Sequence, residues 1–75
     1  MNRKLSEIAR DILQHWKNPY FGAKPYIQAM AQIHSAEPDA PYLFETAEDI
    51  VTYFLANATT FRGEDARRIK AELKK

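Results

Sequence analysis

Few residues of this chain combine the type and the spacing that catalysis or metal binding requires. His15 and His34 are far apart in the sequence, and neither has a second histidine at the spacing of a zinc-binding helix. The chain has no cysteine, which excludes thiol catalysis, disulfides and cysteine-ligated metals. Glycine occurs only at Gly22 and Gly63, so there is no glycine-rich phosphate loop.

The acidic pair at residues 48 and 49 also has a structural explanation. Glu48 and Asp49 are adjacent, so on a helix their side chains diverge, and both suit the positive end of a helix dipole. A chain of 75 residues leaves little room for a substrate pocket and its supporting residues. We therefore expect a protein that is not an enzyme, binds no cofactor and has no metal ligands.

The composition is that of an ordinary globular domain. Hydrophobic residues make up 45% of the chain and charged residues 28%, which is too apolar for intrinsic disorder. No apolar run approaches the roughly 20 residues that span a bilayer, and the N-terminal segment does not have a signal-peptide pattern. We expect one helical domain over residues 1–75 that is cytoplasmic and does not associate with a membrane. A core of this size is marginal, so a homodimer or another partner would add useful buried area.

Hydrophobic residues recur with the helical period in several segments. A first helix is expected from about Leu5, capped by Asn2 or Ser6, and ending before Pro19. A second is expected over residues 25–34, where a proline suits the first turn. The inward stripe of the first helix consists of Leu5, Ile8, Ala9, Ile12, Leu13 and Trp16.

The second half of the chain predicts two more helices after an exposed acidic loop at residues 35–42. Thr46 and Asp49 have the spacing of a capping box at the start of the third helix. Residues 57–60 are expected to end that helix and to cap a fourth, which runs from residue 61 or 62 to residue 73. No segment alternates with period two. The fold class expected is therefore all-α, a compact bundle of about three to four short helices.

Three stretches of the sequence carry a family resemblance. Residues 16–26 contain a Trp-Lys pair and an Ala-x-Pro-Tyr helix start, and residues 54–63 read Phe-Leu-x-Asn-Ala-x-Thr-aromatic-Arg-Gly. Residues 66–74 read Ala-Arg-Arg-x-Lys-x-Glu-Leu-Lys. In these stretches the chain resembles a family of short bacteriophage and prophage proteins, although Phe61 stands where that family more often has Trp. The resemblance implies an accessory role in the cytoplasm of a bacterial host and assigns no activity.

Aromatic side chains are numerous for so short a chain, with four Phe, four Tyr and one Trp. We expect Trp16, Phe54 and Phe61 in the core, because large rings bury the most area. Some of the others should remain at the surface, with Tyr20, Phe21 and Tyr42 as the candidates for an exposed patch of the composition found at protein interfaces. The function predicted is therefore non-catalytic binding of a host or phage protein. The candidate protein-binding residues are Tyr20, Phe21, Lys24, Tyr42 and Arg62.

Nucleic-acid binding by the basic C-terminal helix is the alternative function. Residues 1–25 and 51–75 each carry a net charge of +3, whereas residues 26–50 carry −5. Acidic residues interrupt the C-terminal helix, as on an ordinary solvated face. The charge pattern alone therefore does not decide between nucleic-acid binding and a solvated surface. The candidate contacts to phosphates are Arg67, Arg68, Lys70 and Lys74.

Overall fold

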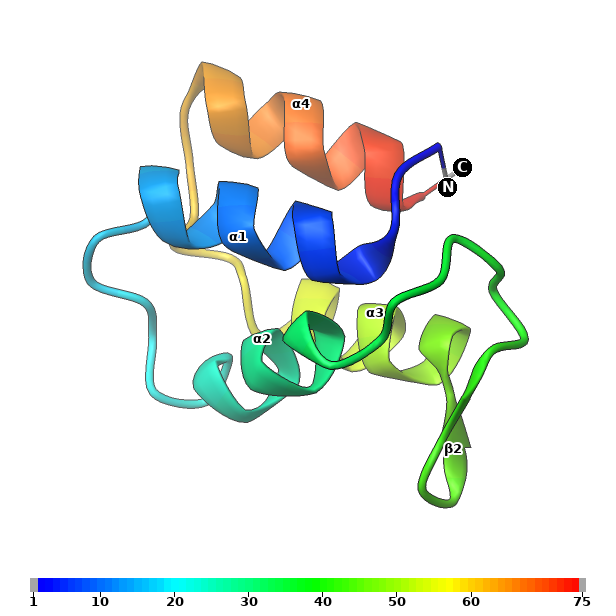
Figure 1. Cartoon of the computed structure of the whole chain (residues 1–75). Helices are drawn as coiled ribbons and strands as arrows, with labels where there is room; N and C mark the ends of the chain where they lie inside the picture. Colours follow the sequence, from blue (N-terminus) through cyan, green and yellow to red (C-terminus); the bar gives the residue numbers. More distant parts are fainter. Residues whose placement is uncertain (1, 75) are drawn as a thin grey trace.

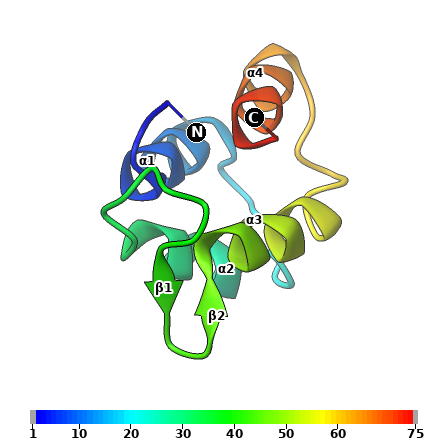
Figure 2. The same ribbon diagram turned by 90° about the vertical axis from the view of Figure 1, so that its right-hand side faces the viewer.

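The computed structural model describes residues 2–74, which form four helices and one short β-hairpin. Helices α1 and α4 lie side by side and run in opposite directions, with α2 and α3 below them in Figure 1. The hairpin projects from the end of the molecule at which α3 begins (Figure 2). The elements are α1 (Leu5–His15), α2 (Lys24–Ala31), β1 (Pro41–Tyr42), β2 (Glu45–Thr46), α3 (Ala47–Ala56) and α4 (Glu64–Leu73).

The mostly helical fold is confirmed, but the expectation of a purely all-α bundle is wrong because of the hairpin. Each strand has two residues, which is too short for a period-two pattern to appear in the sequence. No helix in residues 2–74 is long and apolar enough to cross a membrane.

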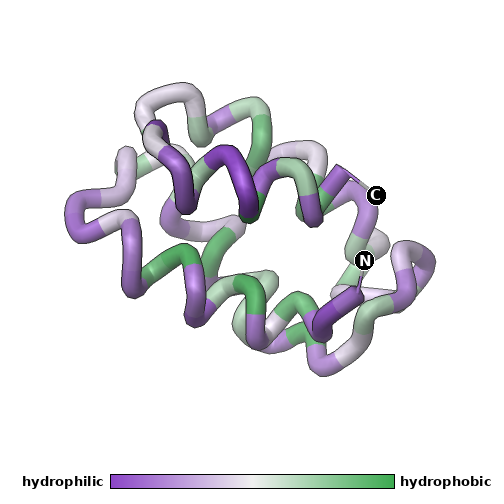
Figure 3. The backbone as a smooth tube through the Cα atoms, turned by 90° about the horizontal axis from the view of Figure 1, so that it is seen from above, coloured by the Kyte–Doolittle hydropathy of each residue, from purple (hydrophilic) through white to green (hydrophobic). Residues whose placement is uncertain are grey.

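Helix α1 is amphipathic and packs against α2 and α4. Figure 3 shows hydrophobic and hydrophilic positions alternating along it, beside the mostly hydrophilic α4. The inclusion of Leu13 in the buried stripe is wrong, because 52% of this side chain is exposed. Leu13 lies at the edge of the stripe, in a shallow hollow that Pro19 and Lys24 also line. The stripe that is buried consists of Leu5, Ile8, Ala9, Ile12 and Trp16.

Three aromatic rings join the two halves of the chain in the core. Trp16 stacks on Phe61 with 4.9 Å between ring centroids and 14° between ring planes. Its other contact is with Phe54, which it meets edge-on at 6.3 Å. All three rings are buried, which confirms their prediction as core residues. Both arrangements are favourable geometries for aromatic pairs.

The start of α1 is capped by backbone, so the expectation that Asn2 or Ser6 caps it is wrong. The amide of Leu5 donates to the carbonyl of Ser35 at 2.9 Å, and the amide of Ser6 donates to that of Ile33 at 3.0 Å. These bonds satisfy two of the amides that a helix start leaves free. The residues that accept these bonds follow α2, which ends at Ala31 and does not reach residue 34 as expected.

The same loop also caps α3. The amide of Ala47 donates to the carbonyl of Ala40 at 2.8 Å, and the amide of Glu48 donates to that of Pro38 at 2.9 Å. The acidic loop, which the structure places at residues 32–40 because residues 41 and 42 form β1, is therefore bonded to the first turns of two helices. These contacts fix the direction in which the hairpin leaves the body of the protein.

The N-termini of α3 and α4 test two further expectations. The Thr46–Asp49 capping box is confirmed, with the Asp49 amide donating to the Thr46 hydroxyl at 3.3 Å. Helix α4 begins only at Glu64, after Gly63 at a φ of 110°, and residues 57–60 do not cap it. Phe61 is drawn into the core beneath Trp16, and the chain around it therefore stays irregular.

Removal of the Phe54 ring tests this account of the core. We expect Phe54→Ala to lower the free energy of unfolding by about 3–5 kcal/mol, because the ring is fully buried and its loss leaves a cavity. The matched control is Thr52→Ala on the exposed face of the same helix, with an expected loss below about 0.5 kcal/mol. Urea unfolding followed by circular dichroism measures both, and equal losses would contradict the assignment.

Candidate protein-binding surface

The β-hairpin presents two large apolar side chains at its tip. Tyr42 pairs with Glu45, so the loop consists of Leu43 and Phe44 alone. Two-residue hairpin loops favour Gly, Asn or Asp, because they require a positive φ. Leu43 occupies that position at a φ of 55°, and it is the one non-glycine residue in the described chain with a positive φ. For a residue with a Cβ, this conformation costs about 1–2 kcal/mol.

Both tip side chains are in water. Leu43 is 83% exposed and Phe44 is fully exposed. They border a shallow hollow on α2 and α3, where the rings of Tyr26 and Tyr53 lie 5.6 Å apart. We call this surface the hairpin patch; it consists of Tyr26, Tyr42, Leu43, Phe44, Glu45, Ile50 and Tyr53.

The charge of the hairpin patch is negative. Glu45 is its one charged member, and a hydrogen bond to the Glu45 carboxylate raises the pKa of the Tyr53 hydroxyl. Asp49 on the first turn of α3 adds a smaller contribution of the same sign. No Lys or Arg lines the patch within residues 2–74. The patch therefore combines apolar surface with a negative potential.

The candidate protein-binding residues from the sequence do not form one site. Tyr42 belongs to the hairpin patch and is half-buried there. Tyr20 and Phe21 are exposed as expected, with ring centroids 4.9 Å apart. They lie on the loop between α1 and α2, at the opposite end of the molecule from the hairpin (Figure 1).

Lys24 and Arg62 also lie away from the hairpin patch. Lys24 begins α2 and lines the shallow hollow beside Leu13. Arg62 is exposed, and its Nε donates to the carbonyl of Thr59 at 3.2 Å. This bond ties Arg62 to the turn after α3.

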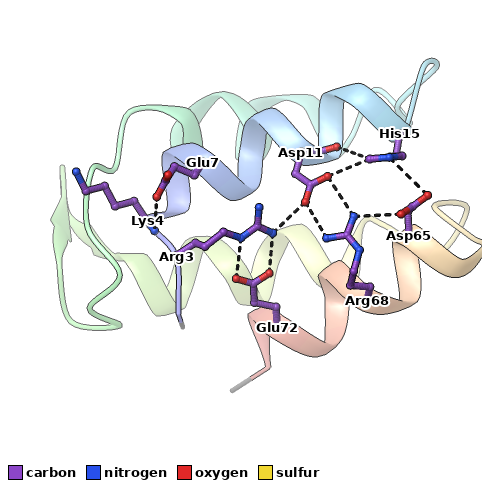
Figure 4. Close-up of polar contacts among 8 residues, drawn as sticks. All are labelled: Arg3, Lys4, Glu7, Asp11, His15, Asp65, Arg68 and Glu72. Atoms are coloured by element: carbon purple, nitrogen blue, oxygen red, sulfur yellow. Dashed lines mark hydrogen bonds and ion pairs between the residues drawn. The ribbon is translucent and has the colours of Figure 1, made fainter.

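Arg68 is engaged in an ion-pair network between α1 and α4 (Figure 4). It bonds Asp11 at 2.9 Å and Asp65 at 3.1 Å. Arg3 bonds the same Asp11 at 2.9 Å and Glu72 at 2.7 Å. Arg68 and Arg3 hold the pKa of Asp11 down at about 2. One candidate phosphate contact is thus already paired with carboxylates.

Lys70 has a partner as well. Its Nζ donates to the carbonyl of Ala58 at 2.7 Å and lies 5.8 Å from the centre of the Phe61 ring. Burial lowers its pKa, and the nearby charges of Lys74 and Arg62 lower it further. Of the four candidate phosphate contacts, Arg67, Arg68 and Lys74 are exposed at the surface, and Arg68 is the one of these three that is held in ion pairs within residues 2–74.

The described residues hold no group of three or more His, Asp or Glu side chains that could bind a metal ion together. No family model, no curated protein and no solved structure matches the chain. The resemblance to short phage proteins therefore stays a prediction.

The sequence analysis did not identify most of the hairpin patch. Tyr42 was named, but Leu43 and Phe44 were placed at no site. A signal was available, because the adjacent Leu-Phe pair lies between the loop predicted at residues 35–42 and the third helix, and so has no helix face on which to be buried. Tyr26 and Tyr53 could not be joined to it, because only the tertiary fold brings α2, α3 and the hairpin together.

The ion-pair network predicts a loss of stability in acid. The pKa of Asp11 is about 2 in the folded protein against 3.8 ordinarily, so its contribution is present above about pH 4 and is lost as the pH falls toward 2. We expect Asp11→Asn to cost about 1 kcal/mol at pH 7 and only a small part of that at pH 2, where the carboxyl is about half protonated in the folded protein. Urea midpoints of both proteins between pH 7 and pH 2 measure this. A constant difference across the range would contradict it.

The left-handed conformation of Leu43 predicts a substitution that stabilises the protein. Leu43→Asn places a residue that tolerates this φ at an exposed position, and we expect a gain of about 0.5–1 kcal/mol. For a domain of this size, that gain corresponds to a rise in Tm of about 2–8 °C. Thermal unfolding measures it, with Phe44→Asn as the control at a negative φ. A clear drop in Tm for Leu43→Asn would show that the side chain is packed.

Proposed function

We propose that the chain is a non-catalytic binding module and that the hairpin patch binds a host or phage protein. The observation that carries the proposal is the pair Leu43 and Phe44, two large apolar side chains in water at a hairpin tip. One of them also holds a backbone conformation that disfavours its type. Strained residues concentrate at functional sites, and contiguous exposed apolar surface marks interaction sites.

The attachment of the hairpin supports binding with little loss of conformational freedom. Ala47 and Glu48 bond the carbonyls of the preceding loop, and the Thr46–Asp49 capping box follows at once. The tip therefore lies on backbone that is held at both of its ends. Preorganisation of this kind lowers the entropic cost of association. The resemblance to phage proteins supports an accessory role inside a bacterial host.

Nucleic-acid binding by α4 has weaker support. Arg68 is paired with Asp11 and Asp65, and Lys70 bonds a backbone carbonyl. Of the four, Arg67 lies just after the acidic first turn of α4, and Lys74 lies at the opposite end of the helix; both are exposed. Few unpaired cations mean few phosphate contacts, and hence weak binding.

Site-specific cross-linking tests the proposed function. A photo-reactive phenylalanine analogue replaces Phe44 in the chain expressed in a bacterial host, and a second protein carries the analogue at Phe21 as the control. We expect a discrete cross-linked protein from position 44. That protein is then identified and purified, and its affinity is measured for the wild-type chain and for Phe44→Ser.

We expect Phe44→Ser to weaken this affinity by about 10- to 30-fold, the effect of losing a central aromatic contact. Phe21→Ser and Arg67→Glu should leave it within about twofold. Unchanged affinity in Phe44→Ser would exclude the hairpin patch. A loss confined to Arg67→Glu would move the binding site to the basic helix.

A further inference from the structure

We infer that the hairpin patch receives an apolar segment of another protein that is flanked by Lys or Arg residues. The inference rests on the proposed function and adds the chemistry of the partner. It follows from the charge around the patch, from the size of the patch, and from what a second copy of the chain would bring to it.

The charge around the patch selects a cationic partner. The patch contains Glu45 and no Lys or Arg, and residues 26–50, which include its hairpin, carry five acidic and no basic residues. The carboxylates of Glu45 and Asp49 already raise the pKa of Tyr53. A partner with positive charge beside its apolar side chains would meet a complementary potential, which favours association and excludes acidic competitors.

A second copy of the chain fits the patch poorly. A symmetric dimer places the same surface on both subunits. Two hairpin patches facing each other would bring Glu45 and Asp49 of one copy toward those of the other, with no cation in either patch to separate them. Like charges at an interface cost several kcal/mol.

The size of the patch favours a short segment over a broad surface. A standard interface involves about 20–30 residues on each side. The hairpin patch has seven, and its most exposed members are the two adjacent tip residues. A peptide-like segment with apolar side chains for the Tyr26–Tyr53 hollow and flanking cations for the acidic residues matches both its size and its chemistry.

Selection from a display library of random short peptides tests the inference without knowledge of the partner. The wild-type chain is the bait, and binders that also hold Phe44→Ser are removed. Phe44 is fully exposed, so this variant should fold, and circular dichroism checks that it does. We expect the enriched peptides to combine aromatic or aliphatic residues with a net positive charge.

One enriched peptide is then synthesised, labelled and titrated by fluorescence anisotropy. We expect its Kd to rise at least about tenfold in Phe44→Ser and about threefold in Glu45→Gln. Glu64→Gln, an exposed acidic residue at the start of α4, is the matched control and should leave the Kd unchanged. Raising the salt from about 50 to about 300 mM should weaken binding to the wild-type chain more than to Glu45→Gln.

Each other outcome overturns the inference in a distinct way. Enriched peptides that depend on Phe44 but are neutral or acidic would overturn the cationic partner and leave the proposed function intact. If no enriched peptide depends on Phe44, the patch is not a docking site for short segments, and the cross-linking experiment alone then decides the proposed function. A dimer in sedimentation that Phe44→Ser dissociates would identify a second copy as the occupant.

Discussion

The stack of Trp16 on Phe61 connects the first helix to the turn before the last one, and the remaining packing is arranged around it. Phe54 closes the same cluster from α3. These three rings, the aliphatic stripe of α1 and apolar side chains of α2, α3 and α4 make up the core. The other aromatic side chains lie at or near the surface. A chain of 75 residues has too small a core to bury nine aromatic side chains. An exposed aromatic residue is therefore ordinary on its own, and the hairpin patch is distinguished by having several of them together.

The acidic loop between α2 and β1 brings the side chains of the hairpin patch together. Its carbonyls accept hydrogen bonds from the first amides of both α1 and α3, so its path is fixed at two points. The hairpin continues that path and meets Tyr26 and Tyr53 on neighbouring helices. The loop thus caps two helices and positions the hairpin, whose Glu45 places a carboxylate beside the apolar tip.

The sequence was sufficient for the elements that repeat a pattern. The stripe of α1, the Thr46–Asp49 capping box and the three core aromatics follow from spacing and ring size. Leu13 fell outside the stripe because its exposure depends on where α2 and α4 lie. The hairpin was missed because Leu43 occupies a turn position that normally requires Gly or Asn, so the local signal pointed away from a turn. Arg68 looked available because its partner Asp11 is 57 residues away.

The most direct measurement of the central claim is a map of amide chemical shifts in the labelled chain, recorded during titration with the protein that cross-links at position 44. The account predicts shifts concentrated in residues 41–46 and around Tyr26 and Tyr53, with the Tyr20–Phe21 loop and α4 unchanged. Shifts concentrated in α4 around Arg67, with the hairpin unchanged, would contradict it and make the basic helix the binding surface.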